Sequence, residues 1–397
     1  MQKNNLSLIL VTAFLDLLGF WIFLPLFPEL IAYFWYPGSW TAYSQWIYAF
    51  WMFIGGLIFG RLSDLYGRKN ILLITSIGNL FGYILLYLSI HNFSNIQHSI
   101  YGFMLSAGFL MYIFSRFIAW LWGAGFSVIQ AYISDISTPE NKTKNMGLVG
   151  AMFWLGFLVW PMIGGMLSVF GISTAVLGCI VVILINIVFI WLFLKEPEKH
   201  VHIEDAVDII HSTFRFSRKV VLLLGLSFFA FIAFSTIQAG SNQYYADMFH
   251  FNSTTIGYVM GIVGTTSIIY QWFLIKYIRA HLNEQRMIQF SLIILSVAFF
   301  LFAINPYAYL VFCIVPLFSI GMGSFNPSLS SLLASNAQRK DIWKIMGYNT
   351  AVTSIAGIIG PFIIGSLYLY DIHFPFWFSL AICIILAICS IFAFDRK

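Results

Sequence analysis

Apolar segments of about twenty residues recur along the whole chain, and short polar stretches separate them. A helix of roughly 20 apolar residues is long enough to cross the hydrocarbon core of a bilayer. The pattern predicts twelve such helices, at residues 6–32, 41–60, 70–90, 105–134, 145–168, 172–194, 220–246, 254–276, 286–304, 307–335, 345–369 and 373–394. We therefore expect an all-α integral membrane protein.

The composition supports this class of protein and argues against several others. Hydrophobic residues make up 60% of the chain and charged residues only 9%, whereas soluble domains carry roughly 25% charged residues. The four cysteines show no metal-binding or redox spacing, and the chain lacks the Gly-x-x-x-x-Gly-Lys-Ser/Thr loop that binds nucleotides. No nucleophile stands out with a base and an orienting acid. We expect neither an enzyme nor a bound metal or cofactor.

The basic residues predict the orientation in the membrane. With an even number of spans, 19 of the 20 Lys and Arg fall on one side, and the exception is Arg116 within the fourth span. Cytoplasmic loops are enriched in Lys and Arg, so this side and both termini are expected to be cytoplasmic. The formal charge of +5 is thus a signal of topology and gives no reason to expect nucleic acid as a partner.

The chain also contains an internal repeat. A set of residues in the fifth span recurs 200 positions later in the eleventh, and these pairs include Lys144 and Lys344, Gly147 and Gly347, Pro161 and Pro361, and Gly165 and Gly365. Such a repeat is typical of two halves that arose by duplication. We predict two pseudo-symmetric six-helix bundles, at 1–194 and 220–397, with a cytoplasmic linker at 195–219.

The turn between the second and third spans carries the most specific motif. Residues 60–69 read Gly-Arg-Leu-Ser-Asp-Leu-Tyr-Gly-Arg-Lys. This order resembles the cytoplasmic signature of the major facilitator superfamily, which implies that family's fold and alternating access. The resemblance assigns a cytoplasmic gate to Gly60, Asp64, Gly67, Arg68 and Lys69, and to Asp135 at the end of the fourth span.

The first and fifth spans resemble those of the twelve-span drug:proton antiporters, the tetracycline exporters among them. The first reads Leu-Asp-Leu-Leu-Gly-Phe at 15–20 and Leu-Pro-Leu-Phe-Pro at 24–28. The resemblance implies close helix packing at small residues and prolines, namely Gly156, Pro161, Gly164 and Gly165, with Gly360 and Pro361 in the repeat. Three positions depart from the pattern: Trp120 and Trp160 replace glycines, and Leu295 replaces an acidic residue. The last departure counts against tetracycline as the substrate.

Two charged residues within the spans are candidates for proton coupling. An ionised carboxylate deep in an apolar span is costly unless it is paired or wetted, so Asp16 is expected to face a cavity and to carry protons. A structural carboxylate that bonds a neighbouring helix is the alternative. Arg116 could hold Asp16 ionised, receive an anionic group of the substrate, or serve as a structural partner.

These features together predict a proton-coupled transporter that exports a small amphipathic organic molecule. Polar and aromatic side chains are candidates to line its cavity: Trp21, Trp120, Gln238, Asn242, Tyr245, Asn326 and Asn349. The alternative is a proton symporter that imports an organic anion or a nutrient metabolite. A membrane-embedded enzyme or a receptor on the same scaffold is a further, weaker alternative. We expect a monomer in a cell membrane, as in a bacterial inner membrane, with protons and the substrate as its partners.

Overall fold

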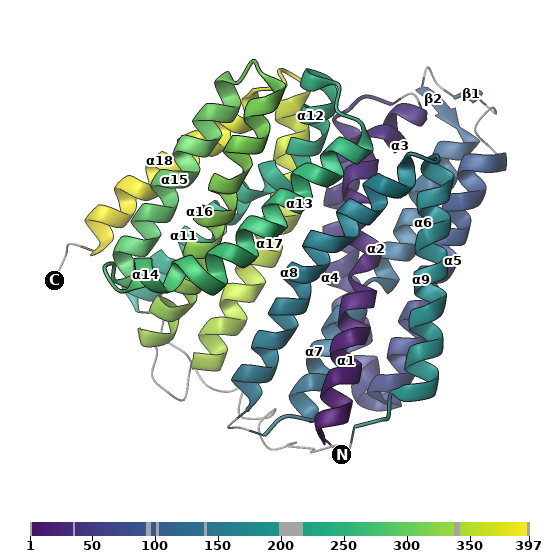
Figure 1. Ribbon diagram of the computed structural model, residues 1–397, viewed down its shortest axis with the longest axis horizontal. Helices are drawn as coiled ribbons and strands as arrows, with labels where there is room; N and C mark the ends of the chain where they lie inside the picture. Colours follow the sequence, from purple (N-terminus) through teal and green to yellow (C-terminus); the bar gives the residue numbers. More distant parts are fainter. Residues whose placement is uncertain are drawn as a thin grey trace.

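The computed structural model describes residues 2–34, 36–92, 97–100, 103–138, 141–197, 217–336 and 342–394. Nearly all of them are helical, and Figure 1 shows the helices of the two halves of the chain packed as two bundles side by side. The linker expected at 195–219 falls largely outside the described residues. The boundaries of the two halves therefore stay a prediction.

The first half runs from α1 to α9. Its elements are α1 (Gln2–Asp16), α2 (Leu18–Trp21), the 3₁₀-helix η1 (Leu24–Leu26), α3 (Phe27–Tyr33), α4 (Trp40–Tyr66), α5 (Arg68–Asn92), β1 (Gln97–Ile100), β2 (Phe103–Ser106), α6 (Ala107–Trp122), α7 (Gly125–Asp135), α8 (Lys142–Ser168) and α9 (Ile172–Phe193).

The second half runs from α11 to α18. Its elements are α11 (Arg218–Ser235), the π-helix η2 (Thr236–Gly240), α12 (Ser241–Phe249), α13 (Ser253–Ile269), the π-helix η3 (Tyr270–Leu274), α14 (Ile275–Arg279), α15 (Glu284–Ile304), α16 (Ala308–Ser335), α17 (Ile342–Tyr368) and α18 (Phe374–Phe394).

The expected number of spans agrees with these elements, but two spans are not continuous helices. Ten helices of the described chain are long and apolar enough to cross a membrane. The first span is instead divided into α1, α2, η1 and α3, and the fourth into α6 and α7. Proline favours helix starts and disrupts helix interiors, and Pro25 and Pro28 stand at the beginnings of η1 and α3.

One segment forms strands. Residues 91–104, between the third and fourth predicted spans, form a longer outer loop in the sequence interpretation. The structure has the short antiparallel strands β1 and β2 there, with Gln97 opposite Ser106 and Ile100 opposite Phe103. This hairpin stands beside the ends of α5 and α6 in Figure 1.

The two halves contact each other along two pairs of long helices, α8 with α13 and α4 with α17. We call the side of the molecule where α1 begins the terminal side, and the opposite side the distal side. The turn between α4 and α5 lies on the terminal side, and the turn between α8 and α9 lies on the distal side. Each half also has its own buried apolar clusters.

Glycines show where the two halves meet. On the distal part of α8, a Cβ added to Gly165 would come within 2.8 Å of the Ser253 carbonyl oxygen in the other half. On the distal part of α17, a Cβ at Gly365 would come within 3.0 Å of the Tyr43 ring. Nothing lies within 4 Å of such an atom at Gly147 or Gly347, near the terminal ends of the same helices. The halves are therefore in close contact on the distal side, whereas Gly147 and Gly347 face open space.

Candidate functional site

The first span breaks beside Asp16. The last carbonyl groups of a helix have no partner within it, so a break inside a membrane needs outside donors. The Nε1–H group of Trp160 donates to the Phe14 carbonyl at 2.9 Å, and the Nδ2–H group of Asn242 donates to the Leu24 carbonyl at 2.9 Å. Trp160 belongs to the first half and Asn242 to the second. Both halves thus hold the broken helix.

Asp16 faces a second break. It is half-buried, and its carboxylate lies against Gly125, the first residue of α7, where the fourth span resumes. A Cβ on Gly125 would lie 3.0 Å from each carboxylate oxygen of Asp16 and 3.2 Å from the Thr75 hydroxyl oxygen. Helix N-termini favour negative charge, and glycine permits the close approach. Discontinuous helices that meet in this way are typical of binding and coupling sites in transporters.

Arg116 is separate from this carboxylate. Its guanidinium is fully buried, with its central carbon 4.9 Å from the centre of the Phe23 ring and 4.8 Å from that of the Tyr83 ring. Its Nη2 atom has no hydrogen-bond partner among the described residues. Among the described residues Arg116 forms no ion pair with Asp16, so one of its three possible roles, holding Asp16 ionised, has no direct contact in this conformation. The two aromatic rings hold the cation in place of a carboxylate.

The gate residues on the terminal side do come together. The Nη2 atom of Arg68 lies 2.5 Å from a carboxylate oxygen of Asp64, and its Nε atom lies 2.7 Å from one of Asp135. Its Nη1–H group donates to the Ser63 hydroxyl at 2.6 Å, and that hydroxyl donates to the Gly60 carbonyl at 2.6 Å. One arginine therefore links the end of α4 to the end of α7.

The sequence interpretation missed Glu196, which follows α9 at the start of the expected linker and joins this cluster. Its carboxylate accepts hydrogen bonds from the backbone N–H groups of Arg68, at 2.5 Å, and Lys69, at 2.9 Å. These are free donors at the N-terminus of α5, where negative charge is favoured. Gly67 has φ +95°, and a Cβ there would lie 3.0 Å from the Glu196 carboxylate. Gly67 thus serves both the turn and this contact.

Lys69 and Gly60 differ from the rest of the gate. The Lys69 ammonium group donates to the Trp191 carbonyl at 2.9 Å, so it holds α5 against the end of α9. Gly60 has no atom within 4 Å of an added Cβ. The segment that precedes α17, which the gate is expected to face, falls outside the described residues at 337–341.

Polar residues of α4, η2 and α12 join the two halves on the distal side, and they include the cavity candidates Gln238 and Asn242. Asn242 bonds Leu24 in η1, as described above. In addition, the Thr41 hydroxyl donates to Gln243 Oε1 at 2.6 Å. The Gln45 Nε2–H group donates to the Gln238 carbonyl at 2.8 Å. These bonds join α4 to η2 and α12, across the two halves. The acceptor of the Gln45 bond belongs to the π-helix η2, and Asn242 and Gln243 directly follow it at the start of α12.

Two aromatic candidates for the cavity are core residues in this structure. Trp21 is only 2% exposed and packs edge-on against Phe153 and Phe157, with ring centroids 5.1 and 4.6 Å away. Tyr245 is likewise buried, in the main apolar cluster of the second half. Both rings are buried in this conformation, where large aromatic side chains gain most from packing against neighbours, and their expected role in the cavity stays a prediction.

The other cavity candidates lie on three separate helices. Gln238 is exposed on η2, and Asn326 is half-buried on α16. The Oδ1 atom of Asn349, on α17, is buried without a hydrogen-bond partner among the described residues. The side chain of Trp120 lies outside the described residues, so its expected role stays a prediction.

The expected packing positions bring backbones close together at some sites. A Cβ on Gly164 would lie 2.3 Å from the Ile22 carbonyl oxygen in the break of helix 1. One on Gly360 would lie 2.1 Å from the Ser235 hydroxyl oxygen. Gly156 has only ordinary contacts, and Pro161 and Pro361 lie buried inside their helices.

Comparison with known families agrees with this architecture. The family model described as Major Facilitator Superfamily matches residues 9–340 and 281–397, nearly the whole chain. The chain belongs to the major facilitator superfamily. It is therefore a multi-pass membrane protein of that superfamily's fold.

Proteins with similar sequences in this superfamily are named for drug resistance. A class H tetracycline resistance protein of Pasteurella multocida is 26% identical, over 100% of this chain and 98% of that protein. Multidrug resistance protein 2 of Bacillus subtilis (strain 168) is also 26% identical, over 95% of this chain and 92% of its own length.

Solved structures of the superfamily share the fold at low sequence identity. A D-xylose-proton symporter superposes with a TM-score of 0.74 at 13% identity, covering 99% of this chain and 97% of its own. A human organic anion transporter gives a TM-score of 0.64 at 19% identity, over 98% of this chain and 99% of its own.

Proposed function

We propose that this protein is a proton-coupled secondary transporter that exports a small amphipathic organic molecule by alternating access. The observation that carries the proposal is the carboxylate of the half-buried Asp16, which lies between the break in the first span and the N-terminus of α7. A carboxylate in this position can take up and release a proton as the helices around it move. The resistance proteins that resemble the chain support export as the direction.

The two closures of the molecule support a rocking mechanism. Hydrogen bonds between α4 and the η2–α12 segment hold the distal side, and the Arg68 cluster connects α4, α7 and the end of the sixth span on the terminal side. Moving one half against the other would break the first set and let the second set meet the opposite half. The gate residues would then control conformation without touching the substrate.

We place the terminal side in the cytoplasm, following the distribution of basic residues, and expect the protein to work as a monomer. In this arrangement the structure is closed to the outside. A substrate that is partly apolar suits the aromatic composition, which reaches 19% of the chain. Leu295 is fully buried in the second half, where the tetracycline exporters carry an acid, so tetracycline is a poor candidate.

Transport into inside-out vesicles tests the proposal. Ethidium, an amphipathic fluorescent cation, and tetracycline serve as probes, and acidifying the lumen reproduces the proton gradient of the cell. We expect ethidium to accumulate in the lumen with the wild-type protein. Asp16→Asn should bind ethidium but neither concentrate it nor respond to pH. Asp371→Asn, in an exposed turn on the distal side, is the matched control and should behave as wild type. Pumping by Asp16→Asn that still depends on the proton gradient would exclude Asp16 as the coupling site.

Arg116 favours a second candidate, a proton symporter for an organic anion. Its guanidinium is buried without a carboxylate partner among the described residues, and a planar donor fork suits a carboxylate of a substrate. Benzoate is a suitable probe in the same vesicles. A symporter would carry benzoate out of the acidified lumen, and Arg116→Lys would weaken its binding at least 10-fold. Luminal accumulation of ethidium without benzoate transport would leave export as the function.

A further inference from the structure

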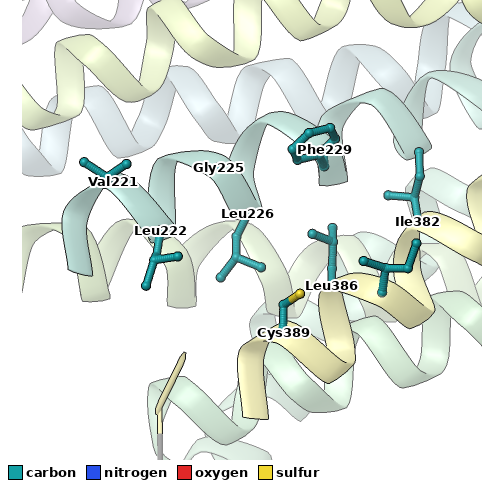
Figure 2. A pocket seen from close by; sticks show the side chains of 9 residues that line it. Val221, Leu222, Gly225, Leu226, Phe229, Ile382, Leu386 and Cys389 are labelled. Atoms are coloured by element: carbon teal, nitrogen blue, oxygen red, sulfur yellow. The ribbon is translucent and has the colours of Figure 1, made fainter. Parts of the chain in front are cut away.

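An apolar groove runs along the outside of the second half, between α11 and α18. It has a volume of about 370 Å³ and is lined by Val221, Leu222, Gly225, Leu226, Phe229, Ile382, Ile385, Leu386 and Cys389. In Figure 2 the side chains of Leu222 and Leu226 on α11 face the same space as those of Leu386 and Cys389 on α18. The volume falls within the range of roughly 300–1,000 Å³ that small-molecule sites show.

Glycine helps to keep the groove open. An atom added as Cβ at Gly225 would have nothing within 4 Å, although the same helix is tightly packed against α17 on its other face, at Ser235. The rim is exposed as well, since Phe229 is 49% and Ile385 is 57% exposed. Exposed apolar surface of this extent is suited to hydrocarbon chains, because these residues lie within membrane-spanning helices.

Two cations stand at the terminal end of the groove. Arg218 precedes Leu222 by four residues and Gly225 by seven, so helical spacing puts it on the same face as the groove. Lys219 follows it, and both are exposed. Neither Arg218 nor Lys219 forms an ion pair with a carboxylate of the described residues.

We propose that this groove binds a phospholipid with an anionic headgroup, in the leaflet on the terminal side. One acyl chain lies between α11 and α18, and the phosphate rests near Arg218 and Lys219. Lys and Arg extend their charged ends toward the membrane surface, where each attracts anionic lipid, with a gain in affinity of roughly five-fold for each charge. This inference does not depend on the direction or the coupling of transport.

The transported molecule fits the groove less well. Sites that select a small molecule place a few polar groups among apolar ones to fix its orientation. The lining here is aliphatic and aromatic apart from the Cys389 thiol, and its cations stand at one end only. That pattern matches the division of a lipid into a chain and a headgroup.

Native mass spectrometry of the purified full-length protein tests the proposal. The probes are phosphatidylglycerol and phosphatidylcholine with identical chains, offered in equal amounts. We expect wild-type protein to retain phosphatidylglycerol at least five-fold better. Arg218→Gln with Lys219→Gln should reduce this preference to less than two-fold while keeping weak binding of both lipids. Gly225→Leu, whose Cβ would have nothing within 4 Å and whose side chain would occupy the groove, should lose most binding of both lipids.

A matched control removes two other exposed cations on the terminal side. Lys276→Gln with Arg279→Gln on α14 should leave the lipid preference unchanged. An equal loss of the preference for phosphatidylglycerol in this control would show a general effect of charge and overturn the proposal. So would a preference that survives Arg218→Gln with Lys219→Gln. Full lipid retention by Gly225→Leu would show that lipid is not the occupant of the groove. Displacement of the bound lipid by ethidium from the wild-type protein would show the same.

Discussion

The carboxylate of Asp16 lies against Gly125, so the break in the first span faces the point where the fourth span resumes as α7. An added Cβ on Gly125 would stand 3.0 Å from both carboxylate oxygens. That distance is too short for a normal contact, so the glycine is what allows Asp16 to reach the N-terminal end of α7. The pair joins a titratable group to two discontinuous helices.

Replacing this glycine should uncouple transport. Gly125→Ala is expected to push the Asp16 carboxylate away from α7 and to reduce proton-driven ethidium accumulation at least 10-fold. Folding should change little, because the carboxylate ends a flexible side chain. Gly56→Ala is the control, since its Cβ would meet only the Ser127 hydroxyl at 3.9 Å. Vesicle assays at equal protein content measure both. Normal accumulation by Gly125→Ala would show that the contact has no part in coupling.

The indole of Trp160 should stabilise the break in the first span. Trp160→Phe keeps an aromatic ring stacked on Phe14 but removes the donor to the Phe14 carbonyl. An unsatisfied buried carbonyl costs about 1–3 kcal/mol, so the melting temperature in detergent should fall by several degrees. Trp191→Phe, on an indole that is 65% exposed, should not change it. If the two variants melt alike, the hydrogen bond does not stabilise the break.

Replacing Gly60 in the gate should reduce transport without changing folding or insertion. Gly60 has open space around it here, so Gly60→Leu should fold and insert normally. The larger side chain should interfere when the terminal ends of the two halves approach, and ethidium transport should fall at least 10-fold. Asp64→Asn should act in the same direction, because it weakens the contact with Arg68. Wild-type rates for both variants, at matched expression, would remove the gate from the mechanism.

Replacing Gly67 or its contact Glu196 should lower the free energy of unfolding. Gly67→Ala places a side chain at φ +95° and against Glu196, at a cost of about 1–2 kcal/mol. Glu196→Ala should cost a similar amount, about 0.5–2 kcal/mol, by removing the cap of α5. Thermal unfolding checks both values. Combining the two changes should cost less than their sum, because both disturb one contact; strict additivity would contradict this account.

The orientation can be tested with single cysteines in a protein that lacks its own four. Phe170→Cys and Tyr370→Cys place thiols in exposed turns on the distal side, and Leu65→Cys and Tyr277→Cys place them on the terminal side. In intact cells an impermeant maleimide should label the first two and not the second two. The opposite pattern would reverse the orientation inferred from the basic residues.

The sequence by itself predicted the spans, the repeat and the gate, because these depend on local properties. Hydrocarbon thickness sets the length of an apolar helix, and the charged residues of the motif at 60–69 therefore lie at the ends of the two helices that it joins. The Arg68 cluster with Asp64 and Asp135 is an example, since all three stand at helix ends on one side. The departures at Trp160 and Leu295 were also visible in the sequence, but their consequences were not.

The tertiary structure decided everything that depends on contacts between distant segments. The breaks in the first and fourth spans face each other, and Trp160 and Asn242 supply donors to the broken first span that no local pattern reveals. The tertiary structure also separated Arg116 from Asp16 by holding the cation between two aromatic rings. Trp21 lies in the core, and Asn242 forms a contact across the two halves. A polar or aromatic residue in a membrane helix can serve a cavity, a core or an interface, and only its neighbours determine which.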